Sequence, residues 1–552
     1  MKIALQGPRA FLIAVWAIGF GFLAFRLGLQ NDDWAYVLRN PEHDTVERLI
    51  QSDHMHFFRP LYRVVVPAFW TLFADHSCIP HLLTGLVHGM CAVSLYRLIK
   101  SLGGELTSAM IAALIYLVYP VHEQLMFWPT AIGTSLAIWG AAEALRWCAR
   151  RRWFNAAGDL RTPHRDGAGG ELSAVFLYDR MPRFFAEGVR VGLALGAAAF
   201  ILAGLNEQPA MLMLAAPLIV LLRSGGPARW RLIRAGIVGA PVVAALGYYT
   251  LCHTIASSPP PATGWGSVVK PDDMPRRLYG MLETIGEDMW LHEWATGAFW
   301  TGWRTISTHP WRLAASVAAL AACAPSWWRW AWARPTVSWK AGAGLLVVGL
   351  AIVVLAWLPI ARVWYAMGSR LHGAPLVGLC LMLGGAGSVL GASFGEATLR
   401  VLRTWALAAM LVATPVCLLM LIGTQRAYQD RWQRDRNELE QLRALVPDPP
   451  PNAIFVPVDI EMPVPVTGST RFDFERRSVF ASWWSSGWSV RRTFRRPDLD
   501  CTWTDWGRPE LVVVERDAAG KITAVRTPDR NVDPTRAILF RVDKHSNVSL
   551  VD

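Results

Sequence analysis

The stretch A-G-A-G-L-L-V-V-G-L-A-I-V-V-L-A-W-L-P-I occupies residues 341–360 and contains no charged side chain. An apolar run of about 20 residues is long enough to cross the hydrocarbon core of a bilayer as a helix. We expect such spans at residues 10–29, 79–99, 107–121, 129–147, 188–204, 208–223, 234–253, 311–325, 341–360, 373–391 and 404–423. The sequence therefore predicts a mainly α fold, a polytopic membrane bundle of about 11 transmembrane helices.

The composition supports this class and excludes others. Of 552 residues, 53% are hydrophobic and 17% charged, whereas soluble proteins carry about 25% charged residues. Intrinsic disorder is excluded because too much apolar surface needs burial. The net charge of +12 comes from Arg clusters between apolar runs, so it indicates membrane topology and not nucleic-acid binding. The eight Cys are scattered without a CxxC pair, so we predict no zinc site and no disulfide framework.

Basic residues predict the orientation of the spans, because cytoplasmic loops are enriched in Lys and Arg. The basic positions are Lys2 and Arg9, Arg97 and Lys100, Arg150 to Arg152, Arg223 to Arg234, Arg329 to Lys340, and Arg400 and Arg403. With eleven spans and a cytoplasmic N-terminus, all of them fall on the cytoplasmic side. The chain is then a multi-pass protein of the inner or plasma membrane, with its C-terminal region outside the cytoplasm.

The sequence predicts two parts, a transmembrane module at residues 1–424 and an extracytoplasmic domain at residues 425–552. The second part opens with helical spacing over Gln425–Val446 and continues with β-like runs such as Ala453–Val458. Two further runs flank Asp517-Ala518-Ala519-Gly520, a signal for a β-hairpin. We therefore expect a small α/β or β-rich domain.

The segment after the first span carries the adjacent carboxylates Asp32 and Asp33. They are either a helix N-cap, for which Asp is preferred, or a site for proton abstraction or cation binding. Close like charges raise one pKa, which favours the general-base alternative. Further along the chain, Arg59 begins a short apolar stretch that is predicted to form a helix lying at the membrane interface. His81 and His88 are expected to be satisfied histidines packed between helices.

Short polar turns between spans supply the next candidates. His122 and Glu123 lie in one turn and Glu207 in another. These side chains either bind a sugar hydroxyl or a phosphate, or merely face water. Ionisable groups at membrane depth usually face a cavity or a partner.

The cationic candidates are Arg370 and Arg362, which sit on the outer side against the topological charge bias. Phosphate binding is one reason for such a residue, because the guanidinium presents a planar fork of donors. Ordinary interfacial anchoring is the alternative.

The order of these motifs resembles the GT-C superfamily of membrane glycosyltransferases, especially its protein O-mannosyltransferase-like members and more loosely the lipid A aminoarabinose transferases. The resemblance spans about residues 10–425. It rests on Asp32-Asp33, Arg-Pro-Leu (59–61), His81 and His88, Tyr-Pro-Val-His-Glu (119–123), Asn-Glu-Gln (206–208) and Ser-Arg-Leu-His (369–372). Relatives often have Lys-Glu where this chain has Asn206-Glu207, and Arg-Tyr where it has Arg370-Leu371. Some relatives carry tetratricopeptide repeats where this chain has a β-rich region.

The resemblance implies a sugar donor linked through phosphate to a polyprenol, and transfer outside the cytoplasm with inversion. Asp32 or Asp33 would be the general base that deprotonates a hydroxyl of a glycan, lipid or protein acceptor. The remaining roles fall into two groups. Arg370, His122, Arg59 and Arg362 would bind the donor phosphate and lipid, and Glu123, Glu207 and His372 would bind substrate. No metal or other cofactor is implied.

Two alternatives stay open, a lipid or solute transporter and an inactive scaffold on the same fold. Transporters commonly show internal repeats with matching broken spans. The sequence has no such pairing, and its acidic groups cluster at one face.

Overall fold

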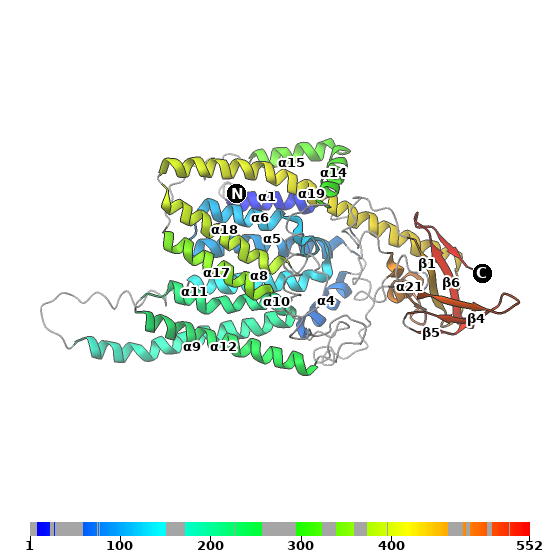
Figure 1. Ribbon diagram of the computed structural model, residues 1–552, viewed down its shortest axis with the longest axis horizontal. Coiled ribbons are helices and arrows are strands. Elements are labelled where there is room, and N and C mark those ends of the chain that lie inside the picture. Colours follow the sequence, from blue (N-terminus) through cyan, green and yellow to red (C-terminus); the bar gives the residue numbers. More distant parts are fainter. Residues whose placement is uncertain are drawn as a thin grey trace.

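The computed structural model describes residues 8–21, 27, 59–73, 76, 78–150, 172–225, 227–256, 294–322, 338–357, 372–394, 396–461, 478–481, 486–504, 511–528 and 530–551. Within these ranges the chain is mainly helical, and its strands are confined to the C-terminal region (Figure 1). The longer helices are α1 Pro8–Gly21, α4 Pro60–Phe73, α5 Cys78–Ser101, α6 Leu106–Val118, α8 Ile132–Arg150, α9 Leu172–Leu205, α11 Ala215–Arg223, α12 Ala228–Ala256, α14 Trp294–Ser307, α15 Pro310–Ala322, α17 Trp339–Trp357, α18 Gly373–Ser393 and α19 Glu396–Leu445.

Six helical segments among the described residues are long and apolar enough to cross a membrane. They are Cys78–Ser101, Phe185–Leu205, Ala228–His253, Trp339–Trp357, Gly373–Ser393 and Glu396–Leu445. The chain is thus a multi-pass membrane protein, and the expected count of about eleven spans is not reached within this part of the chain. A helix follows Arg59 as expected and is α4; its position at the membrane interface stays a prediction.

The expected span at 208–223 is wrong as a single helix. This stretch is divided into α10 Glu207–Ala210, the 3₁₀ segment η7 Met211–Leu214, and α11. Pro209 and Pro217 each lack a backbone N–H donor, so neither can donate to the carbonyl one turn earlier. The α-helical hydrogen bonding is therefore interrupted by the 3₁₀ segment, although the backbone keeps right-handed helical angles at the junctions between the three segments.

Basic residues gather at one end of the bundle. Arg403 of α19 donates from Nη2 to Glu105 Oε1 at 3.1 Å, at the start of α6. Beside it, a Cβ on Gly103 would lie 3.1 Å from Ala341 of α17 and 3.9 Å from Arg223 of α11. Several helix ends therefore meet at this end of the bundle. They carry the basic residues that the sequence assigns to the cytoplasmic side. Among the described residues these are Arg97, Lys100, Arg150, Arg223, Arg229, Arg231, Arg234, Lys340, Arg400 and Arg403.

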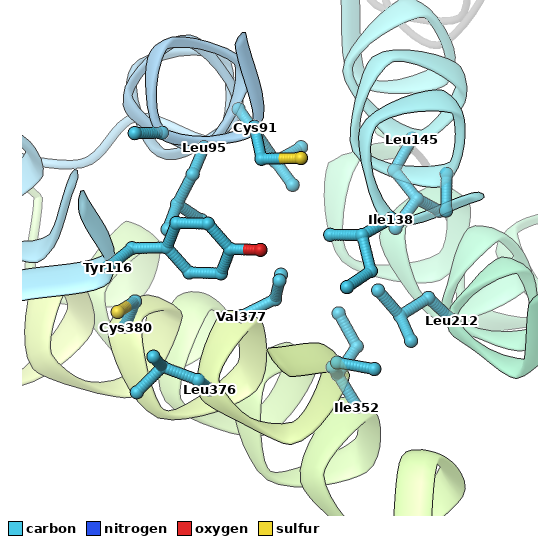
Figure 2. Packing of buried hydrophobic residues seen from close by; sticks show 14 of the residues in the cluster. Cys91, Leu95, Tyr116, Ile138, Leu145, Leu212, Ile352, Leu376, Val377 and Cys380 are labelled. Carbon is cyan, nitrogen blue, oxygen red and sulfur yellow. The ribbon is translucent and has the colours of Figure 1, made fainter. Parts of the chain in front are cut away.

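Close helix packing builds the core of the bundle. On α17 and α18, a Cβ on Gly349 would lie 2.6 Å from the carbonyl oxygen of Gly378, and one on Gly385 would lie 2.7 Å from that of Gly342. Only glycine permits backbones to approach this closely. Around this crossing, apolar side chains from α5, α6, α8, α17 and α18 interdigitate in a single buried cluster (Figure 2).

Helix α19 continues out of the bundle to the C-terminal strands (Figure 1). The separate helix expected over Gln425–Val446 is instead the C-terminal part of α19, because no proline interrupts the chain between Val416 and Leu445. With 50 residues it is about 75 Å long, more than twice the hydrocarbon thickness of a bilayer. Its charged C-terminal part therefore extends beyond the membrane.

The C-terminal region has two small sheets. In the first, of order β2-β1-β6-β7, β1 (Ile454–Ile460) pairs in parallel with β2 (Asp500–Cys501) and β6 (Ala537–Val542), and β7 (Val548–Leu550) pairs antiparallel with β6. The second contains the predicted hairpin, β3 (Val513–Arg516) with β4 (Ile522–Arg526), followed by β5 (Asn531–Val532). The hairpin is confirmed together with its turn, in which Gly520 has φ +81.

Candidate functional site

The structure places some of the predicted site residues. Asp32, Asp33, Arg362 and Arg370 lie outside the described residues, and so does the side chain of Glu123, whose backbone begins α7 (Glu123–Phe127). The side chains of Arg59, His122, Glu207 and His372 are described. All four come from helix ends opposite the basic end of the bundle.

Arg59 and Glu207 form an ion pair between the segment before α4 and the first residue of α10. Arg59 Nη2 lies 3.5 Å from Glu207 Oε1, and the side chains are 18% and 21% exposed. The guanidinium also lies 6.0 Å from the ring centroid of Tyr62, within cation–π range. Two of the sequence motifs are thus joined across 148 positions of the chain.

Neutral side chains hold this pair in place. Asn206 caps α10 by accepting the Gln208 N–H at 3.1 Å, and its own Nδ2 donates to Thr134 Oγ1 at 2.7 Å. Tyr62 donates its hydroxyl to the Thr130 carbonyl at 3.0 Å. These contacts fix the start of α10 against α8 and α4.

One carboxylate oxygen of Glu207 remains available. Its Oε2 is buried and has no hydrogen-bond partner among the residues that the structure describes. Buried polar atoms in folded proteins nearly always have a partner, so this oxygen is a ready acceptor for a hydroxyl or an ammonium group of a ligand.

His122 lies in a buried group of rings. Its ring centroid is 4.9 Å from that of His88 and 5.1 Å from that of Tyr116. His122 has no exposed surface, and within the described part of the chain neither of its ring nitrogens meets the geometric criteria for a hydrogen bond. The ring therefore lies beneath the surface of this end of the bundle, with two polar atoms unsatisfied.

The other histidines pack as the sequence predicts. His81 Nδ1 is 2.8 Å from the Phe127 carbonyl oxygen, and His88 Nε2 is 3.4 Å from that of Leu117. His372 is fully buried directly before α18, close enough to His122 to interact with it electrostatically.

Contacts connect the two groups of site residues. Glu207 pairs with Arg59, and the Arg59 guanidinium lies against the Tyr62 ring. The Tyr62 hydroxyl in turn donates to Thr130, which follows α7 in the short 3₁₀ segment η4 (Pro129–Ala131). On the other side of α7, a Cβ on Gly373 would clash with the Leu125 side chain, so the start of α18 packs directly on α7. Four motifs that are distant in the sequence thus meet at one end of the bundle.

The residues that position the Arg59–Glu207 pair were not among the candidates predicted from the sequence. Tyr62 carries a readable signal, because it lies three residues after Arg59 and so on the same face of a helix. Asn206 before Glu207 is a typical N-cap signal. Thr130 and Thr134 carry none. Among the described residues no group of three or more His, Cys, Asp or Glu side chains is arranged to hold a metal ion.

Comparisons with known proteins give a likeness to solved structures. No family model and no curated protein matches the chain. The fold is similar to that of an oligosaccharyltransferase from Archaeoglobus fulgidus, solved with a tethered acceptor peptide containing the NVT sequon. The identity is 11% and the TM-score 0.35, over 90% of this chain and 63% of that one. At this TM-score the likeness assigns neither a fold family nor an activity to the chain.

Proposed function

We propose that this chain is a membrane glycosyltransferase that moves a sugar from a polyprenyl-phosphate-linked donor to a hydroxyl of an acceptor outside the cytoplasm. The observation that carries the proposal is the Arg59–Glu207 ion pair, because it joins two polar motifs at the end of the bundle where His122 and His372 also lie. The basic residues lie at the opposite end, so the positive-inside rule assigns the site to the non-cytoplasmic side.

The position suits an amphiphilic donor. Its sugar phosphate must stay at the membrane edge while its lipid tail lies among apolar side chains. Helix α4 starts beside the Arg59–Glu207 pair and is apolar along most of its length, with Leu72 75% exposed. It therefore offers an apolar surface that begins at the polar site.

The proposed reaction is a single displacement. Asp32 or Asp33 takes the proton of the acceptor hydroxyl, whose oxygen forms a bond to the anomeric carbon of the sugar. The bond from that carbon to the phosphate oxygen breaks, and polyprenyl phosphate leaves with the electron pair, so the configuration inverts. Arg370 and Arg362 neutralise the departing phosphate, since fixed cations in a site of low dielectric stabilise developing negative charge.

The remaining residues orient the substrates. Glu207 Oε2 accepts a hydrogen bond from a sugar hydroxyl, and Arg59 holds the carboxylate in position while its other donors face the phosphate. Glu123, which begins α7, and His372, which precedes α18, belong to the same end of the bundle by their backbone positions, and we assign both to substrate binding. His122 lies one layer deeper, so we assign it a supporting role beneath the phosphate.

Glycan and lipid analysis of cells that lack this chain tests the proposal. We expect one sugar-modified product to disappear and to return with the wild-type chain, but not with the Asp32→Asn/Asp33→Asn double variant at equal protein level. Restoration by the double variant would reject catalysis by these carboxylates and favour a transporter or a scaffold.

A further inference from the structure

The turn between α11 and α12, at the basic end of the bundle, concentrates cations in a small volume. Helix α11 ends at Arg223 and α12 begins at Ala228. Arg231 and Arg234 lie three positions apart and so share one face of α12. Arg234 Nη1 donates to the Gly225 carbonyl at 3.2 Å, which brings this face against the turn.

Three of these cations, Arg223, Arg229 and Arg231, lack a nearby carboxylate among the described residues. The first turn of α12 contains no acidic residue, although helix N-termini favour them. Neither Arg223, Arg229 nor Arg231 lies within ion-pair distance of a carboxylate in the part of the chain that the structure describes. The positive-inside rule accounts for basic residues at this end, but it does not account for the burial of Arg234, which is 4% exposed, because Lys and Arg in loops can remain in water.

Two buried donors at this turn have no partner. Ser224 is 5% exposed, and its Oγ has no hydrogen-bond partner in the described ranges. The Nε of Arg231 is also buried and has no partner in these ranges. A hydroxyl, a guanidinium N–H and the free N–H groups at the start of a helix are the donors that bind phosphate oxygens in proteins.

Apolar side chains flank the turn. Leu222, next to Arg223, is 43% exposed, and Leu232, next to Arg231, is 60% exposed. A free phosphate ion gains nothing from exposed leucines, whereas the acyl chains of a lipid cover them. Basic pockets between transmembrane helices are typical binding sites for lipid head groups.

We propose that this turn binds the phosphate group of an anionic phospholipid. Ser224 Oγ and Arg231 Nε donate to the phosphate oxygens, Arg223 and Arg234 supply the surrounding positive charge, and the acyl chains lie along Leu222 and Leu232. This site lies at the opposite end of the bundle from the proposed transfer site and is independent of it.

Native mass spectrometry of the full chain, released from nanodiscs of equal parts phosphatidylcholine and phosphatidylglycerol, tests the site. We expect the wild-type chain to retain phosphatidylglycerol in preference to phosphatidylcholine. Ser224→Ala and Arg231→Gln should each weaken this retention by about tenfold, the effect of losing one charge-assisted hydrogen bond. Arg229→Gln is the matched control, because it removes an equal charge from an exposed side chain of the same turn, and it should weaken retention by less.

Three results would overturn the proposal. Equal retention of the two lipids would remove the preference for an anionic head group. An Arg229→Gln loss as large as that of Arg231→Gln would show diffuse attraction and no defined site. Displacement of the lipid by inorganic phosphate would identify a site for free phosphate. A lower melting temperature of Arg231→Gln would mean that its lipid loss could come from unfolding. The Ser224→Ala result then decides whether the site exists, because this variant removes only a hydroxyl without a partner among the described residues.

Discussion

Glu105 and Arg403 are 298 positions apart and form a buried ion pair, with Oε1 and Nη2 3.1 Å from each other. Their side chains are 5% and 7% exposed. Glu105 also caps α6, because its Oε2 accepts the Ser108 N–H at 2.7 Å. This pair fastens α19, the helix that reaches the C-terminal sheets, to the basic end of the bundle.

Arg403→Met is expected to destabilise the protein by about 3–5 kcal/mol, because it leaves the Glu105 carboxylate buried without its counter-charge. The control is Arg400→Met, one turn earlier on the same helix. Arg400 pairs with Glu396, but the two side chains are 49% and 53% exposed, so we expect a loss of about 1 kcal/mol or less. Unfolding in mixed micelles measures both, and equal losses would show that the buried pair does not hold α19.

Gly349→Ala should weaken the packing of α17 on α18. The added Cβ would lie 2.6 Å from the Gly378 carbonyl oxygen, so one helix must shift. We expect a loss of about 1–3 kcal/mol, typical of overpacked cores. Gly236→Ala is the control, since a Cβ there meets nothing within 4 Å, and its higher helix propensity should leave stability unchanged or slightly raised. Full stability of Gly349→Ala would contradict the close approach.

How well the sequence predicts a structural feature depends on how far apart in the chain the interacting residues are. Local signals are confirmed: the helix opened by Pro60, the hairpin around Gly520 and the packed histidine His81. Each depends on neighbouring residues, whose side chains and backbone preferences are visible in a short window of sequence.

Long-range relationships were not predictable. Nothing near Arg59 identifies Glu207 as its partner, and nothing near β1 shows that it pairs in parallel with both β2 and β6. The predicted boundary between the last membrane span and the helix after it was also wrong, because both belong to α19. Hydropathy falls sharply after Gly423, which suggested a boundary, yet the backbone of α19 continues because helix propensity does not fall with it.

The C-terminal region should lose local stability in acid through Asp498. Hydrogen bonds from Arg496, at 2.6 Å and 2.9 Å, and from the Asn452 N–H, at 3.0 Å, hold the pKa of this carboxyl well below its usual range. The folded state thus binds this proton more weakly than the unfolded state does. Its stabilising effect is full above the ordinary Asp pKa of about 3.9 and is lost as the pH falls below that value.

Hydrogen–deuterium exchange of the peptide that contains Asn452 measures this effect. The wild-type protein should keep the protection factor of this peptide at about pH 6 and lose part of it at about pH 3. These two values lie above and below the ordinary Asp pKa of about 3.9. Asp498→Asn should show the lower protection at both. A wild-type loss matched by an equal loss in Asp498→Asn would assign the acid sensitivity to other groups.

Glu207→Gln should lower sugar transfer by about 10- to 100-fold, the effect of losing one hydrogen bond to a charged group. The amide cannot pair with Arg59 as a charge and accepts from a sugar hydroxyl more weakly. The control is Glu187→Gln, an exposed position of α9 near the basic end, which should transfer at the wild-type rate. Unchanged transfer in Glu207→Gln would remove this carboxylate from the site.

Sugar transfer by the Asp32→Asn/Asp33→Asn double variant, measured in membranes supplied with a polyprenyl-phosphate-linked sugar donor, tests the central claim most directly. We predict that transfer is abolished while the melting temperature and the protein level stay those of the wild type. The control is Asp448→Asn, whose side chain is 98% exposed, and it should transfer at the wild-type rate. Full transfer by the double variant would contradict the account, because neither carboxylate would then be required as the general base.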